Sequence, residues 1–195
     1  LNDSHEVLIV EMGMNHFGEL HMLSNIANPT IGVITNIGTA HIGNLGSREN
    51  ILKAKLEILD GMNNGTLIIN NDNDMLRTVK YNNLITVGID NNSDYMATDI
   101  NDDVFSNSFY INDEYIKLPV GSRAFVYNAL FAYAVGIKLG ISSDDIKDAL
   151  GKFKFIFDNG SSIYLHDTNN KNGFKLANRA ISHGCIRVEK PLQFA

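Results

Sequence analysis

The N-terminal third of the sequence consists of short apolar runs separated by stretches with helical spacing. Residues 6–10, 31–37 and 66–69 are almost continuously apolar, as is typical of strands that are covered on both faces. Between them, residues 18–26 and 48–59 place apolar side chains three and four positions apart, which indicates helices. This order of strands and helices predicts an α/β fold with a partial doubly wound parallel sheet.

Local signals set the ends of these helices. Asn28 and Pro29 stop the first helix, because proline removes an amide donor and restricts the residue before it. Ser47 is a favourable N-cap for the second helix, and Gly61 closes it.

The hydrophobic pattern changes after residue 84. Residues 84–89, 108–111 and 115–118 predict short strands, and the last two are joined as a hairpin. A long helix over residues 124–139 follows, and then a shorter one over 146–150 that is capped by the run Ser142–Asp145. We therefore expect a small antiparallel strand region in addition to the parallel sheet.

Charge divides the chain into two parts of opposite sign. Residues 1–150 carry 9 Lys and Arg against 19 Asp and Glu, a net charge of −10, whereas residues 151–195 carry 7 against 3, a net charge of +4. The single cysteine excludes an internal disulfide, and no apolar run approaches the roughly 18 residues that a membrane span requires. We expect neither a membrane span nor a nucleic-acid partner. The sequence begins at Leu1 without the basic region of a secretion signal, so we expect a fragment located in the cytoplasm.

Three runs in the acidic part carry a family resemblance. They are residues 10–15 (VEMGMN), 34–41 (ITNIGTAH) and 54–58 (AKLEI). In this order and spacing they resemble the central ATPase domain of the Mur ligases over roughly residues 1–150, most of all the members that add D-alanyl-D-alanine to the UDP-muramoyl peptide. The resemblance implies ATP and Mg²⁺ as cofactors and a UDP-muramoyl peptide as partner.

The same resemblance implies a magnesium site. By likeness to the family, Glu11 and His41 are magnesium ligands, and Lys55 is carbamylated to provide an extra anionic group near the metal. Hard oxygen and imidazole ligands suit an ion that neutralises crowded phosphate oxygens. Taken singly, each residue also has an ordinary explanation, as a solvated strand end, a loop histidine and a surface lysine.

The resemblance further implies an adenine contact at Asn128, although Arg123 or Ala124 stands where the family often has a histidine. The family's phosphate-binding loop ends in Gly-Lys-Thr before the Glu11 strand, and this sequence contains no such run. We therefore expect that this chain does not carry out the ligase reaction. An inactive module that binds nucleotide or muramoyl peptide is the corresponding alternative.

A second set of residues, in the basic part, indicates thiol chemistry. Cys185 stands in the run Ser182–Arg187, and fifteen residues separate His166 from Ser182. A histidine at this distance from Ser-His-Gly-Cys is similar to the end of an L,D-transpeptidase catalytic domain of the YkuD type, over roughly residues 151–195. The resemblance implies a short β-rich segment from that fold, and peptidoglycan stem peptides as partners.

Thiol chemistry gives each of these residues a role. Cys185, as a thiolate, would attack the carbonyl after the third stem-peptide residue, expel D-alanine and hold the peptide as a thioester. His166 would be the general base, while His183 and Gly184 would support the oxyanion region. Arg187 would pair with a substrate carboxylate. This reaction requires no cofactor.

The two parts imply different compartments, because Mur ligases resemble cytoplasmic enzymes and L,D-transpeptidases act outside the membrane. The resemblance to a transpeptidase domain covers only the last third of such a domain. Three hypotheses stay open: a cysteine transpeptidase on a Mur-like scaffold, an inactive binding module derived from the ligase, and a non-functional chimera joined near residues 148–156. An extracellular or cell-wall location follows only from the first.

Overall fold

The computed structural model describes residues 2, 4–103, 106–152, 165–167 and 186–188. The helices and strands of these residues, in chain order, are α1 (Glu19–Ala27), β1 (Ile31–Ile34), α2 (Ile42–Leu45), α3 (Arg48–Leu56), η1 (Glu57–Gly61), β2 (Thr66–Asn70), η2 (Leu76–Thr78), β3 (Leu84–Gly88), β4 (Tyr95–Asp102), β5 (Asn107–Ile111), β6 (Glu114–Leu118), α4 (Arg123–Lys138), α5 (Ser143–Gly151), β7 (Leu165–Asp167) and β8 (Ile186–Val188).

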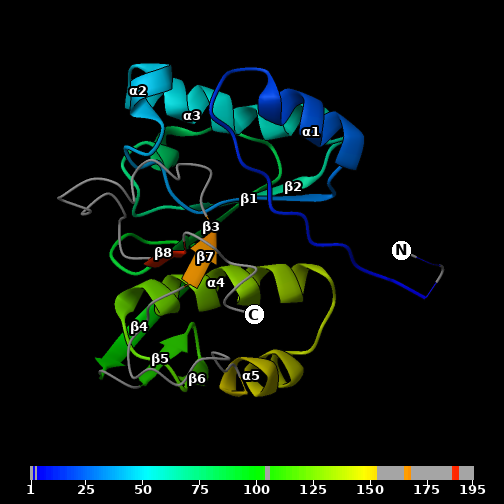
Figure 1. Ribbon diagram of the computed structural model, residues 1–195. Coiled ribbons are helices and arrows are strands. Elements are labelled where there is room, and N and C mark those ends of the chain that lie inside the picture. The colour runs from blue at the N-terminus through cyan, green and yellow to red at the C-terminus, as the bar shows by residue number, and fades with distance from the viewer. Residues whose placement is uncertain (1, 3, 104–105, 153–164, 168–185, 189–195) are drawn as a thin grey trace.

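Strands β1 to β6 form one mixed sheet in sequence order (Figure 1). Strands β1 to β4 run parallel, whereas β4, β5 and β6 pair antiparallel. The α/β prediction is confirmed, with one difference: the antiparallel strands continue the parallel sheet instead of forming a region of their own. Strand β4 joins the two, because it pairs with β3 on one side and β5 on the other.

Strand β4 has no counterpart in the sequence prediction. Half of its residues are polar, and Thr98 and Asp99 are both exposed. The register shifts between Thr98 and Asn101, and Asp99 has a positive φ of 51°. Pairing with its neighbours, rather than a hydrophobic pattern, therefore defines this strand.

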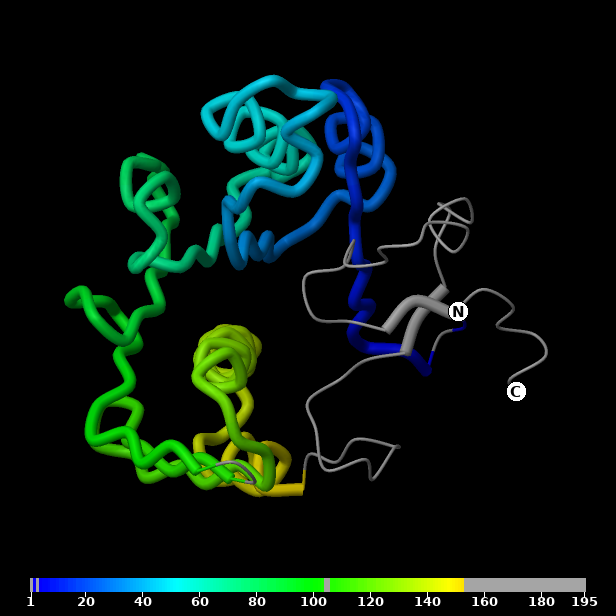
Figure 2. Tube along the Cα trace, turned by 60° about the vertical axis from the view of Figure 1, so that its left-hand side comes forward, coloured from blue at the N-terminus to red at the C-terminus, as the bar shows by residue number. Residues whose placement is uncertain are grey.

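Helices cover both faces of the sheet, with α1 and α3 on one side and α4 on the other (Figures 1 and 2). On β2, Leu67 and Ile69 belong to the hydrophobic cluster that contains Leu20 of α1 and Ile51 of α3. Ile68 belongs to the cluster built around α4. Consecutive residues of β2 thus point into opposite cores, which explains the continuous apolar run of this strand.

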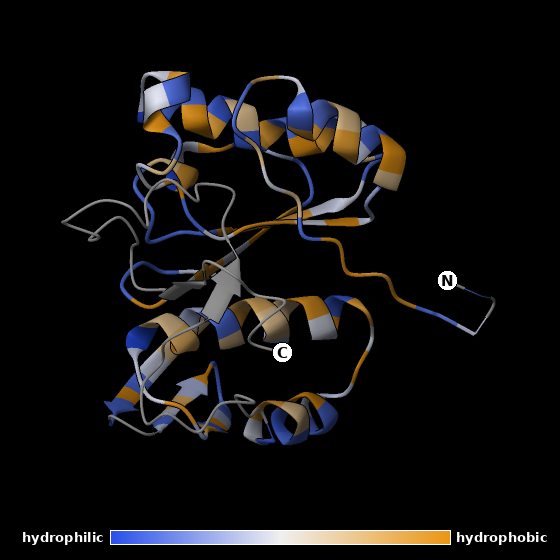
Figure 3. Cartoon of the chain, in the orientation of Figure 1, coloured by the Kyte–Doolittle hydropathy of each residue, from blue (hydrophilic) through white to orange (hydrophobic). Residues whose placement is uncertain are grey.

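The N-terminal apolar run is not a strand. Residues 5–14 have no regular secondary structure, and Figure 3 shows an apolar stretch in this N-terminal segment. The side chains of residues 7–10 are exposed, Ile9 by 88%. The prediction of a buried strand over residues 6–10 is therefore wrong. A buried parallel strand needs a hydrogen-bonded neighbour, and in the described part of the chain β1 pairs with β2 alone.

Several helix ends follow the predicted signals, but α3 ends at Leu56, before the predicted end, and the 3-10 helix η1 continues to Gly61. Asn28 ends α1 in the left-handed region, with φ 45°. Ser47 accepts a hydrogen bond from the Asn50 N–H over 3.2 Å and so caps α3. Ser142 caps α5 in the same way, through the Asp145 N–H.

The basic C-terminal part contributes one strand pair to the described structure. Strands β7 and β8 run parallel, with His166 opposite Arg187. Most of the segment predicted to be β-rich lies outside the described residues, and the domain division at residue 150 stays a prediction. No helix among the described residues is long and apolar enough to cross a membrane.

Candidate functional site

The loop after β1 leads to the predicted residue His41 and is fixed by neighbouring side chains. Lys55 of α3 donates from Nζ to the main-chain oxygen of Asn36 over 2.8 Å. Asn73, which follows β2, donates from Nδ2 to the Asn36 side-chain oxygen over 2.7 Å and to the Ile37 carbonyl over 3.3 Å. The loop is therefore tied both to α3 and to the segment after β2.

An ion pair strengthens this connection. Arg48 donates to the Ile37 carbonyl over 2.8 Å, and its two terminal nitrogens bind the two carboxylate oxygens of Asp74 at 2.5 and 2.8 Å. The hydrogen bonds from Arg48 lower the pKa of Asp74. Because a bidentate pair has a fixed geometry, it holds the loop after β1 close to the segment after β2.

Lys55 differs in its environment from Lys53, the other lysine of α3. Its side chain is half-buried, whereas Lys53 on the same helix is exposed. Burial lowers the pKa of the Lys55 amine, because removal from water disfavours the charged form. More of the amine is then neutral at a given pH, and only the neutral amine reacts with carbon dioxide.

His41 occupies the junction between this loop and α2. It stands at the N-cap position with a φ of 65°, in the left-handed region that histidine adopts more readily than most residues. Its carbonyl accepts hydrogen bonds from the Asn44 and Leu45 amides. The backbone of His41 is thus fixed, while its side chain is exposed.

Glu11 lies exposed in the segment that leads toward α1. The turn that follows it is held by Glu19, whose carboxylate accepts hydrogen bonds from the Asn15 amide over 2.5 Å and from the His16 amide over 3.1 Å. These bonds lower the pKa of Glu19, the Asn15 amide having the largest effect. The turn after Glu11 therefore has a defined geometry at the start of α1.

Glu57, which lies in the run 54–58, binds amides at the start of α1. Both carboxylate oxygens of Glu57 accept from the Gly18 amide at 2.9 Å, and one accepts from the His21 amide at 3.3 Å. Gly18 is the N-cap residue of α1 and has no side chain to bind these amides. Glu57 supplies the missing cap and places a negative charge at the positive end of the helix.

The chemistry of this donor set fits Mg²⁺. Glu11 offers a carboxylate and His41 an imidazole, and a carbamylated Lys55 would add a second anionic oxygen donor. Among the described residues, no three His, Cys, Asp or Glu side chains come together as a metal-binding group. The assignment of Glu11, His41 and Lys55 to magnesium stays a prediction.

Asn128 lies exposed in the N-terminal half of α4. The residue before it, Tyr127, donates its hydroxyl to Asp72 over 2.8 Å, and Arg123 pairs with Asp90 at 2.5 Å. Asp72 follows β2 and Asp90 follows β3, so both contacts lie at the carboxyl ends of these strands. Since β1, β2 and β3 are parallel, the structure brings this part of α4 to the same sheet edge as the loop after β1.

The predicted thiol site falls mainly outside the described residues. This applies to Cys185, His183 and Gly184. His166 and Arg187 are described, and they are partners in the parallel pairing of β7 with β8.

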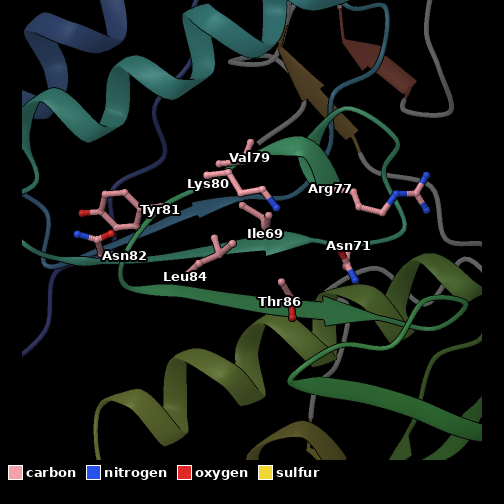
Figure 4. A pocket seen from close by; sticks show the side chains of 9 residues that line it. All are labelled: Ile69, Asn71, Arg77, Val79, Lys80, Tyr81, Asn82, Leu84 and Thr86. Carbon is pink, nitrogen blue, oxygen red and sulfur yellow. The ribbon is translucent and has the colours of Figure 1, made fainter.

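A surface hollow of about 390 Å³ lies over β2 and β3 (Figure 4). Its lining includes two cationic side chains, Arg77 and Lys80, together with Tyr81. None of the predicted site residues lines it, so the hollow is separate from the candidate site.

The mixed sheet, with the polar loops at the carboxyl ends of β1, β2 and β3, defines an α/β domain whose family the comparisons with known proteins identify. A family model for the Mur ligase middle domain matches residues 1–136. The chain therefore belongs to the Mur ligase family, and the predicted resemblance of the acidic part is confirmed.

Among curated relatives, the chain is similar to two UDP-N-acetylmuramoyl-tripeptide--D-alanyl-D-alanine ligases. It is 36% identical to that of Bacillus subtilis over 152 residues, which cover 76% of this chain and 33% of the relative. The match to the ligase of Treponema pallidum is 28% identical over 193 residues and covers 94% of this chain and 41% of the relative, so it extends beyond residue 150.

Solved structures support the same family assignment. MurF from Acinetobacter baumannii superimposes with a TM-score of 0.73 at 30% identity, over 80% of this chain and 36% of that chain. MurF ligase from Thermotoga maritima in complex with ADP gives a TM-score of 0.65 at 25% identity, over 80% and 38%. The chain thus spans about a third of the length of curated relatives that it matches.

Several residues that shape the candidate site were not predicted from the sequence. They are Arg48, Glu57, Asp72 and Asn73. The run Asn70-Asn71-Asp72 directly after a buried strand was the available signal, because polar residues at the carboxyl end of a parallel strand often shape a ligand site.

Proposed function

We propose that this chain forms the magnesium and adenine side of an ATP site, in a ligase that joins D-alanyl-D-alanine to a UDP-muramoyl tripeptide. Membership of the Mur ligase family supports the reaction class, and the similarity to UDP-N-acetylmuramoyl-tripeptide--D-alanyl-D-alanine ligases supports the substrate. The single observation that carries the proposal is the contact of Lys55 with the Asn36 main chain, since it places a half-buried amine of lowered pKa on the loop that leads to His41.

Each residue has a defined task in this proposal. The neutral Lys55 amine attacks carbon dioxide, a C–N bond forms, and one proton leaves to solvent, which gives a carbamate anion. Glu11 and His41 hold the metal, and the exposed amide of Asn128 contacts the adenine ring. Bound Mg²⁺ neutralises the charge of the phosphate oxygens. Asn73 and the Arg48–Asp74 pair fix the loop from which these groups act.

Equilibrium dialysis of the chain with Mg-ATP tests this function. We expect saturable binding well below millimolar concentration, weakened by Glu11→Gln and by His41→Ala. Glu6→Gln is the matched control, because Glu6 is exposed in the same N-terminal segment and has no proposed role. Binding no tighter than millimolar, or equal loss in the control, would contradict the proposal.

A second candidate function is L,D-transpeptidase-type acyl transfer by the C-terminal part. One observation favours it: β7 and β8 pair in parallel, in a register that sets His166 opposite Arg187. In this proposal the Cys185 thiolate attacks the peptide carbonyl, a thioester forms, and D-alanine leaves as the amine takes up a proton. Mass spectrometry after treatment with a carbapenem tests it. We expect one adduct that Cys185→Ala abolishes, and the absence of an adduct on the folded protein would leave the ligase-derived module or the non-functional chimera.

A further inference from the structure

Asp72 connects two strand ends and a helix. Its carboxylate accepts hydrogen bonds from the Ile89 amide over 2.6 Å, from the Asn91 amide over 2.7 Å and from the Asn91 side chain over 2.8 Å. The Asp90 amide lies 3.1 and 3.2 Å from its two oxygens. One side chain at the end of β2 thus organises the whole turn that follows β3.

The same carboxylate reaches α4. The Tyr127 hydroxyl donates to Oδ2 of Asp72 over 2.8 Å, and the guanidinium of Arg123, one turn earlier, binds Asp90 in the organised turn. Tyr127 and Arg123 are four residues apart, so they lie on one side of the helix. These two contacts therefore fix how the first turns of α4 are rotated about the helix axis.

Asn128 follows Tyr127 directly. Successive residues of an α-helix are about 100° apart around its axis, so the direction of Asn128 is set once Tyr127 is held. Asn128 is exposed, and none of the described hydrogen bonds fixes its side chain. Tyr127, in contrast, is half-buried and bonded to Asp72. The orientation of the predicted adenine contact thus depends on the residue before it.

The charge state of the pair keeps the contact in place near neutral pH. Burial would raise the pKa of Asp72, but the bonds from Ile89, Asn91, Tyr127 and Asp90 lower it to about 2. Burial, followed by the bond to Asp72, raises the pKa of Tyr127 to about 12. Asp72 is therefore an acceptor and Tyr127 a donor throughout the physiological range.

We infer that Asp72 and Tyr127 are positioning residues that orient Asn128 and so determine the preference of the site for adenine. The inference rests on the proposed function. An asparagine amide can pair with both N6 and N7 of adenine, and hypoxanthine replaces the N6 amino group by an oxygen. Correct orientation of Asn128 therefore matters for ATP more than for ITP.

Binding of Mg-ATP and Mg-ITP to the whole chain, measured for wild type and Tyr127→Phe, tests the inference. One lost positioning hydrogen bond predicts about fivefold weaker ATP binding, with ITP binding unchanged. Tyr133→Phe is the matched control, because Tyr133 is a buried tyrosine on the same helix whose ring packs against Tyr95 at 5.7 Å. We expect this control to leave both affinities unchanged.

The remaining outcomes separate this inference from the proposed function. Equal loss for ATP and ITP, or no loss for either, would overturn the positioning role of Tyr127. If wild type binds neither nucleotide, the proposed function fails, and amide hydrogen exchange then tests the Asp72–Tyr127 contact by itself. We expect Tyr127→Phe to accelerate exchange at residues 126–129 without nucleotide, and unchanged exchange there would overturn the inference.

Discussion

Gly61 and Ser24 lie in direct backbone contact, where η1 crosses α1. A Cβ atom added to Gly61 would lie 2.1 Å from the Ser24 carbonyl oxygen and 2.2 Å from its carbonyl carbon. Ser24 is itself fully buried, and its hydroxyl donates to the Glu57 carbonyl over 3.1 Å. The absence of a side chain at Gly61 therefore permits the approach of the two helices.

Gly61→Ala should destabilise the fold strongly. No rotamer change can relieve a contact between a Cβ and a main-chain carbonyl, so α1 has to shift, which costs about 3 kcal/mol. Urea unfolding followed by circular dichroism measures the loss. Gly43→Ala in α2 is the control, since a Cβ there meets nothing within 4 Å and should change stability by less than about 1 kcal/mol. Similar loss in both variants would contradict the close contact.

Glu57→Ala should weaken the start of α1. The Gly18 and His21 amides lose their acceptor, and replacing a helix cap costs about 1 kcal/mol. The midpoint of urea unfolding reports the change. Glu6 is an exposed glutamate without such a contact, so Glu6→Ala should leave the unfolding midpoint unchanged. An equal shift of the midpoint in both variants would show that Glu57 does not cap α1.

Lys55 should carry a carbamate in the presence of bicarbonate. In ¹³C-bicarbonate, NMR should show a carbamate carbon signal that Lys55→Arg removes and that Lys53→Arg, on the exposed face of the same helix, retains. The signal should grow as pH rises toward the lowered pKa of Lys55, because the neutral fraction of the amine increases. A signal that survives Lys55→Arg would assign the carbamate to another amine.

Asp72 should make stability fall at acid pH. Its pKa is lowered from 3.8 to about 2 in the folded chain, so its stabilising contribution is present above 3.8 and disappears as pH falls toward 2. With screening by solvent, the contribution is on the order of 1 kcal/mol. Unfolding midpoints of wild type and Asp72→Asn between pH 5 and 2 should therefore converge at the acid end. Parallel curves would contradict this.

Asn107→Ala should destabilise the entry to α4. Asn107 is 1% exposed, and its amide donates to the Val120 carbonyl over 3.0 Å and to the Ser122 carbonyl over 2.9 Å. Two lost hydrogen bonds inside the fold predict about 2 kcal/mol of destabilisation. Ser108→Ala, at the half-buried neighbouring position, should cost clearly less in the same unfolding experiment.

The fold could be predicted from the sequence wherever a local pattern decides the structure. The apolar run of β2 and the caps at Ser47 and Ser142 require only near neighbours along the chain, and these predictions are confirmed. Strand β4 and residues 6–10 depend instead on pairing with distant segments. The apolar run over residues 7–10 stays exposed, whereas β4, which has no continuous apolar pattern, forms a strand because it pairs with β3 and β5.

The residues of the candidate site also divide into those that a local motif indicates and those that depend on distant contacts. Glu11, His41, Lys55 and Asn128 were found because short motifs contain them. Asp72 could not be assigned a role in the same way, since its partners Ile89 and Tyr127 lie 17 and 55 residues away in the sequence. The polar run after β2 marks the strand end in the sequence, but it does not indicate which distant residues Asp72 contacts.

The shared strand β2 has a consequence for how the protein unfolds. Leu67 and Ile69 belong to one hydrophobic cluster and Ile68 to the other, so the loss of β2 removes residues from both clusters at once. The two sides of the sheet should therefore behave as one cooperative unit, with a single unfolding transition seen by probes on α1 and on α4 alike.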